Sequence, residues 1–223
     1  MKSRLPPLGL TAGILLYALA MAYLEAAVVV YLGAALGVPT GTIFPIDLSP
    51  AAMPYWWIEV GREGATLVMI GGVAWLAGRS PLERLAWAAV VFGIWDIGYY
   101  AFLWVFSGWP PSLGTWDLLF LLPAPWAGPV WAPIAVSAGL IGFGLACAGR
   151  LRAGQSVRFG KRRLGALLLG GAIVIVSFLT NAGLVLDGGT PTSFAWPIFA
   201  VGMGIGMCAA GMALRPRAPR AGA

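Results

Sequence analysis

The sequence contains no histidine, only two cysteines and few charged residues. Without histidine, the chain lacks the commonest transition-metal ligand, an imidazole ligand for haem and the base of a Ser-His catalytic triad. Cys147 and Cys208 both lie inside apolar runs, so we interpret them as small buried hydrophobes rather than as a disulfide or a thiolate metal site. Charged residues make up 10% of the 223 residues, against about a quarter in soluble domains. The composition therefore excludes an ordinary soluble domain.

Long hydrophobic runs take the place of the missing charge. Hydrophobic residues make up 60% of the chain, and the mean hydropathy is +0.86. Apolar runs of about 20 residues recur along the sequence, which predicts an all-α polytopic membrane protein. We expect one domain over residues 1–223, a bundle of six transmembrane helices at about 9–34, 55–78, 85–107, 126–149, 164–186 and 194–214. In the third loop, Ser112 is placed to cap a short interfacial or re-entrant helix that runs to Leu122.

Small residues indicate where these helices pack closely. The first span reads Ala18-xxx-Ala22-xxx-Ala26, a ridge that lets another helix approach. The sixth span carries Gly202, Gly204, Gly206 and Gly211, which predict the same kind of close helix packing.

The distribution of basic residues predicts the orientation in the membrane. Every lysine and arginine except Arg62 lies before the first span, in the second or fourth loop, or after the sixth span. In the first, third and fifth loops the charged residues are all acidic: Asp47, Asp117 and Asp187. This is the positive-inside pattern, so we expect a multi-pass protein of the bacterial inner (plasma) membrane with both termini cytoplasmic. The net charge of +6 is therefore a topology signal, and we expect the lipid bilayer, not nucleic acid, as its partner.

Charged residues interrupt the apolar runs in three consecutive spans. The second span carries Glu59, Arg62 and Glu63, the first carries Glu25 and the third carries Asp96. Each such group costs roughly 2.5–3.5 kcal/mol near the centre of a spanning helix, so charges there usually face a protein interior or an aqueous cavity. All of them fall in the outer half of the membrane, and we expect no charge in the cytoplasmic half. Four carboxylates and one arginine leave a formal excess of three negative charges. We predict a ligand- or ion-binding site at these five residues.

Further polar side chains are expected to support this site: Thr66, Tyr99, Tyr100, Asp117 and Asn181. Arg62 is three residues after Glu59 and can pair with it on the same helix face. Tyr100 lies four residues after Asp96, which is the better spacing of the two tyrosines for a hydrogen bond to that carboxylate. No cofactor is evident and no metal is assigned, although a bound cation would balance the excess charge.

Three functions are compatible with this pattern. We favour an acidic cavity in the outer half of the bilayer that binds or transports a cation or a small cationic solute. The first alternative is a non-catalytic accessory or assembly subunit with other membrane subunits as partners, in which the cluster is a structural ion-pair network. The second alternative is an intramembrane enzyme that uses paired carboxylates as general acid and base. No nucleophile with an adjacent base is visible, so no catalytic residue is assigned.

Overall fold

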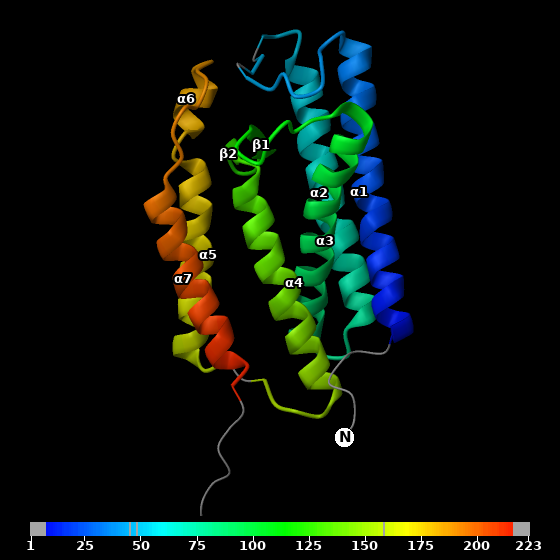
Figure 1. Ribbon diagram of the computed structural model, residues 1–223, viewed down its shortest axis with the longest axis vertical. Coiled ribbons are helices and arrows are strands. Elements are labelled where there is room, and N and C mark those ends of the chain that lie inside the picture. The colour runs from blue at the N-terminus through cyan, green and yellow to red at the C-terminus, as the bar shows by residue number, and fades with distance from the viewer. Residues whose placement is uncertain (1–7, 45, 48, 158, 216–223) are drawn as a thin grey trace, which may run out of the picture.

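The computed structural model describes residues 8–44, 46–47, 49–157 and 159–215. Helices dominate it, and successive long helices run in alternate directions along one axis (Figure 1). The elements are α1 (Leu8–Leu36), α2 (Met53–Ala77), α3 (Pro81–Ser107), β1 (Trp116–Phe120), β2 (Trp126–Pro129), α4 (Trp131–Arg152), α5 (Lys161–Leu179), α6 (Ala182–Leu186) and α7 (Trp196–Ala213). Five helical segments are long and apolar enough to cross a membrane: 8–35, α3, α4, 161–186 and α7. The expectation of a helical multi-pass membrane protein is confirmed at that level.

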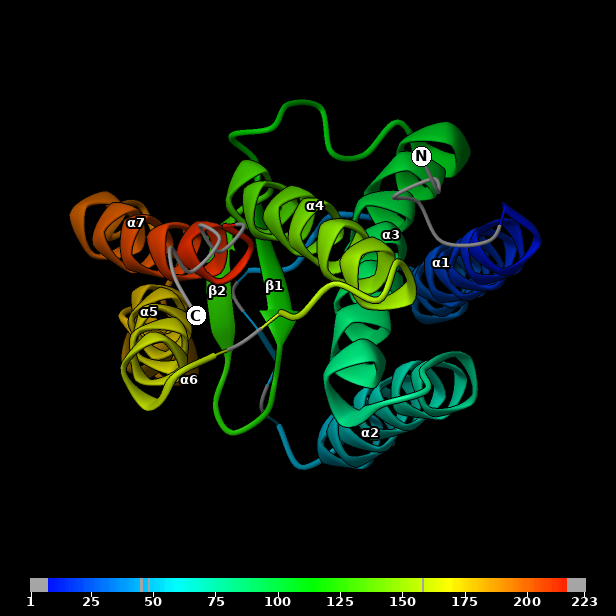
Figure 2. The same cartoon turned by 90° about the horizontal axis from the view of Figure 1, so that it is seen from below.

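Two groups of helices surround a small β-hairpin (Figure 2). In the first group, α3 packs against α1, α2 and α4, and in the second group α5 packs against α7. The groups meet where α4 contacts α7 and where β2 contacts α4, α5 and α6. The first group holds every charged residue predicted within a span, and α3 is the element that its other members share.

Small residues lie at the closest helix contacts, as the sequence predicts. Ala18, Ala22 and Ala26 are fully buried, and a Cβ added to Gly98 of α3 would lie 2.9 Å from the Cβ of Ala22. The alanine ridge is therefore the surface through which α1 packs on α3. In the second group, a Cβ on Gly170 of α5 would meet the backbone of Gly206 at 2.6 Å, and one on Gly202 would meet the backbone of α5 at 2.8 Å. Gly204 and Gly211 are exposed with open space around them, so the close packing predicted for these two glycines is wrong.

The prediction of a short helix in the third loop is wrong, because β1 and β2 form a β-hairpin there. β1 pairs with β2 in antiparallel register, with Trp116 opposite Pro129. Pro123 and Pro125 lie in the connection between the two strands, and a helix there would lack their backbone N–H donors. The paired strands instead satisfy each other's backbone groups in a region that helices cover. Ser112 lies in an exposed turn and contacts Thr115 instead of capping a helix.

Two predicted spans also differ in their limits. The span predicted at 126–149 begins at Trp131, because the residues before it form β2. The span predicted at 164–186 is interrupted between α5 and α6. There the hydroxyls of Ser177 and Thr180 donate to the backbone oxygens of Val174 and Ser177, at 2.6 and 2.9 Å, and such bonds compete with the regular helix.

At the opposite end of the bundle, the structure contains a buried ion pair that was not predicted from the sequence. Glu83 is 3% exposed in the first turn of α3 and forms an ion pair with Arg152 of α4. The backbone N–H of Glu83 donates to the hydroxyl of Ser80 at 3.2 Å, and the carboxylate of Glu83 accepts from the backbone N–H of Arg79 at 3.0 Å. The motif Ser80-x-x-Glu83 is a capping-box signature, so the sequence contained a signal for this helix start.

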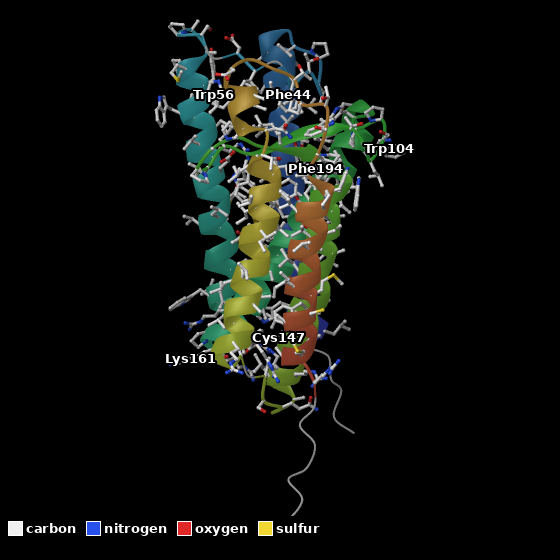
Figure 3. The ribbon with its side chains drawn as sticks, turned by 90° about the vertical axis from the view of Figure 1, so that its left-hand side faces the viewer. Phe44, Trp56, Trp104, Cys147, Lys161 and Phe194 are labelled. Atoms are coloured by element: carbon white, nitrogen blue, oxygen red, sulfur yellow. The ribbon has the colours of Figure 1, made fainter. Side chains whose placement is uncertain are left out.

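The two cysteines are both free, but they differ in burial. Cys147 is buried as predicted, whereas Cys208 is exposed, because α7 packs on α5 and leaves its far side uncovered. Figure 3 shows Cys147 and Lys161 near one end of the bundle and Trp56 and Phe44 near the other.

Candidate functional site

A buried acidic pocket lies between α1, α2, α3 and the β-hairpin. Its volume is about 90 Å³. The polar side chains that line it are Glu25, Glu59, Arg62, Glu63, Trp95, Asp96, Tyr99, Tyr100 and Asp117. The structure thus brings together all five residues of the predicted binding set.

Arg62 is the cation of this pocket, and two carboxylates share it. Its Nε donates to Oε2 of Glu59 at 2.9 Å, and the guanidinium also pairs with the carboxylate of Glu25 on α1. The contact within α2 follows the i,i+3 spacing predicted from the sequence. The planar guanidinium can serve two carboxylates at once, which connects α1 to α2. Arg62 is therefore already neutralised by its partners.

Glu63 and Asp96 have no ion-pair partner among the described residues, although both are nearly buried. Oε1 of Glu63 accepts a hydrogen bond from the backbone N–H of Leu121 at 2.8 Å. Oδ2 of Asp96 accepts from the hydroxyl of Ser137 on α4, also at 2.8 Å. Within the described residues, the protein therefore gives each of these carboxylates a neutral donor and no direct ion pair, although Arg62 attracts Glu63 at longer range.

Asp117 adds a third carboxylate without an ion-pair partner in the part of the chain that the structure describes. It lies on β1 and is 3% exposed. Burial raises the pKa of Asp117 to about 6, and the hydrogen bonds from the hydroxyl of Tyr100 and from the backbone N–H of Leu118, each 2.8 Å long, oppose that rise. The hairpin therefore delivers to the pocket a carboxylate that titrates near neutral pH.

Two polar atoms at the pocket have no hydrogen-bond partner among the described residues. One is Oε2 of Glu63, an acceptor, and the other is Nε1 of Trp95, a donor. These residues are 4% and 7% exposed, respectively. Leaving such a buried group unpaired costs about 1–3 kcal/mol. The pocket thus combines excess negative charge with unpaired hydrogen-bonding groups.

Tyr100 bonds to a different carboxylate from the one predicted. Its hydroxyl donates to Asp117, which the hairpin places beside it, while Asp96 takes Ser137 as its donor. Ser137 reaches Asp96 because α3 and α4 approach closely at Gly93, where an added Cβ would lie 2.6 Å from the backbone oxygen of Ser137. Sequence reasoning missed Ser137, although a glycine one turn before Asp96 is a signal of close approach.

Two predicted supporting residues lie outside the pocket lining. Thr66 is 2% exposed, and its hydroxyl donates to the backbone oxygen of Arg62 within α2 at 3.1 Å. Asn181 lies at the break between α5 and α6, where its side-chain amide donates to the backbone oxygen of Ser193 at 3.1 Å. Leu121 and Trp95, in contrast, line the pocket and were not predicted.

Fold and site together are those of a helical membrane protein with a buried acidic pocket. Within the described ranges, no group of three or more Asp, Glu, Cys or His side chains converges as a metal-ligand set. Comparison of the chain with protein-family models, with curated proteins and with solved structures finds no match.

Proposed function

We propose that the protein binds a cation or a small cationic solute in the acidic pocket, as the first step of its passage into or across the membrane. The carrying observation is that Glu63, Asp96 and Asp117 line one small pocket, while the nearby cation, Arg62, is engaged by two other carboxylates. Burying an unpaired carboxylate costs several kcal/mol, so a bound cation offsets a large electrostatic penalty.

The size and shape of the pocket favour an ammonium group as the bound cation. Its volume of about 90 Å³ leaves room for only a few water-sized groups. The carboxylates come from α2, α3 and β1 and so approach from different walls. A primary ammonium carries three N–H donors that can point to three acceptors at once. Oε2 of Glu63 is one acceptor that is free to receive such a bond.

The same proposal includes α2 as a sixth membrane span. Its charged side chains face the pocket, and its exposed side is apolar, with Trp57, Ile58, Val68 and Leu76 largely uncovered. That distribution is the reverse of a water-facing helix and is what a helix needs when it shields a polar site from lipid. A 25-residue helix is also long enough to cross the bilayer.

The positive-inside rule then orients the bundle. Basic residues gather at the α2–α3 turn, at the end of α4 and at the start of α5, where Figure 3 marks Lys161. We place this end in the cytoplasm, together with both termini, and the acidic pocket in the outer half of the inner membrane. A solute would reach the pocket from outside the cell.

The test is cation-dependent thermal stability of the detergent-purified protein, with methylammonium and potassium as probes. Methylammonium at 100 times its Kd is expected to add about 2.7 kcal/mol of stability. Glu63→Gln and Asp96→Asn should each weaken its binding about ten- to hundredfold, because each removes a charged acceptor. Asp187→Asn is the matched control, since Asp187 is acidic and exposed outside the pocket. The proposal is wrong if no cation stabilises the wild type, or if the control loses as much affinity as the site variants.

A further inference from the structure

A second cavity, of about 380 Å³, lies between α4 and the α5–α7 pair, beside the hairpin. Its volume falls within the ~300–1,000 Å³ typical of ligand pockets. The side chains that line it are almost all apolar, among them Val136, Leu140, Val174, Phe178, Met203 and Met207. Gly139 of α4 also lines it, and a Cβ added there would meet nothing within 4 Å.

Asp96 is the charged residue that lines both this apolar cavity and the acidic pocket. Leu119 of β1 also lines both, so the two spaces share a wall of α3 and the hairpin. Aromatic rings continue this wall, because Trp95 on the polar side packs against Phe92 and Phe120 on the apolar side at 5.4 and 6.3 Å between ring centroids. The two spaces therefore adjoin at Asp96, where a polar group in the acidic pocket would lie next to an apolar body in the second cavity.

From this junction we infer that the ligand is an amphiphile with a primary ammonium head and one apolar chain. The head occupies the acidic pocket, and the chain lies in the apolar cavity. The inference rests on the proposed function, since both use the same acidic pocket, and it names the class of solute.

Size and charge both favour such a molecule. The acidic pocket alone, at about 90 Å³, is below the range of ligand pockets and holds little more than a head group. Bilayer phospholipids carry a phosphate, which would be repelled by Glu63 and Asp117, and Arg62 is already engaged. A head with net positive charge is therefore the complementary one, and the apolar cavity supplies contact area for a single chain.

The test compares methylamine, butylamine and octylamine, with octanol as the chain without a charged head, on the detergent-purified full-length protein. Each methylene that enters the cavity is expected to raise affinity by about fourfold, so octylamine should bind about a hundredfold more tightly than methylamine if about half of its seven additional methylenes are buried, and about 10⁴-fold if all are. Gly139→Leu places a branched side chain inside the cavity and should weaken octylamine binding at least tenfold while leaving methylamine binding unchanged. Gly142→Leu on the same helix is the matched control, because Gly142 is exposed, meets nothing within 4 Å and lies outside the cavity lining.

The outcomes separate this inference from the proposed function. If methylamine binds and octylamine binds no tighter, the inference is wrong and cation binding stands. If Gly139→Leu binds octylamine as the wild type does, or if octanol competes as well as octylamine, the cavity does not hold the chain of a cationic ligand and the inference is again wrong. If neither amine binds, both proposals fail.

To locate the chain directly, octylamine with a terminal diazirine can be photo-crosslinked and the labelled peptides identified. Label on α4, α5 or α7 at the cavity lining, abolished by Gly139→Leu and retained in Gly142→Leu, supports the inference. Label confined to other segments overturns it.

Discussion

Arg62 shows how few cations this membrane interior contains. Its guanidinium pairs with both Glu25 and Glu59, and so it joins α1 and α2, which both pack against α3. Removing one partner of a partly buried ion pair leaves a charge without compensation, which is more costly than removing the pair. The stability of the pocket and its affinity for a cation are thus coupled at this residue.

We therefore expect Arg62→Gln to destabilise the protein by about 2 kcal/mol, because both carboxylates lose their cation. The double variant Glu25→Gln with Arg62→Gln should recover part of that loss, since one uncompensated carboxylate is removed with it. Melting temperatures in detergent measure both effects. Arg162→Gln at an exposed position is the control. A double variant less stable than the sum of the two single variants would contradict the charge balance argued for Arg62.

The raised pKa of Asp117 makes the stability of the fold depend on pH. Its pKa is about 6 in the folded protein against an ordinary value of 3.8, so the folded state binds the proton more tightly. Stability from this residue is therefore fully present below pH 3.8 and is lost as the pH rises to about 6. The loss is on the order of 2–3 kcal/mol.

The measurement is the difference in melting temperature between wild type and Asp117→Asn across this pH range. Asparagine can keep the acceptor role toward Tyr100 but does not titrate. The wild type should fall relative to the variant as the pH rises through about 6 and stay parallel above it. A constant difference at every pH would show that Asp117 does not carry this titration.

At the scale of elements, the sequence predicts the helices that their own composition encodes, and it does not predict the strands, which depend on contacts with other segments. Apolar runs place α1, α2, α3 and α7 to within a few residues, because a spanning helix is encoded by its own composition. The hairpin depends on contacts between its strands and with three helices, α4, α5 and α6, so no periodicity of residues 112–129 reveals it. Its absence from the prediction matters for the site, because the hairpin supplies the backbone donor to Glu63 and positions Asp117.

The crossing of α3 and α4 can be tested with a single methyl group. Gly93→Ala would place a Cβ 2.6 Å from the backbone oxygen of Ser137, so α4 must move and the Ser137–Asp96 hydrogen bond weakens. We expect a loss of about 1–3 kcal/mol in stability, together with weaker methylammonium binding. Gly142→Ala meets nothing within 4 Å and should be neutral or gain about 0.5–1 kcal/mol of helix stability. Equal melting temperatures for the two variants would contradict the close approach at Gly93.

At the scale of the whole molecule, the predicted charged residues of three spans do converge on one pocket. The sequence predicts the relative position of these residues along each helix, because the rise per residue converts sequence position into distance. The sequence does not predict the wall shared by the acidic pocket and the apolar cavity. That wall combines Asp96 of α3 with Leu119 of β1, and the cavity behind it is lined by helices far along the chain. That wall depends on the relative positions of the two helix groups, which hydrophobic runs do not specify.

The orientation of the whole bundle gives the last prediction. Cysteines introduced one at a time at Ala51, Arg79 and Ser156 of a Cys208→Ser background, in which the remaining Cys147 is buried, probe the two loops that flank α2 and the loop between α4 and α5. A membrane-impermeant maleimide should label Ala51→Cys in intact cells, and should label Arg79→Cys and Ser156→Cys only after permeabilisation. Labelling of Ala51→Cys and Arg79→Cys on the same side would remove α2 from the spans, and its charged face would then need a water-filled setting instead of a pocket shielded from lipid.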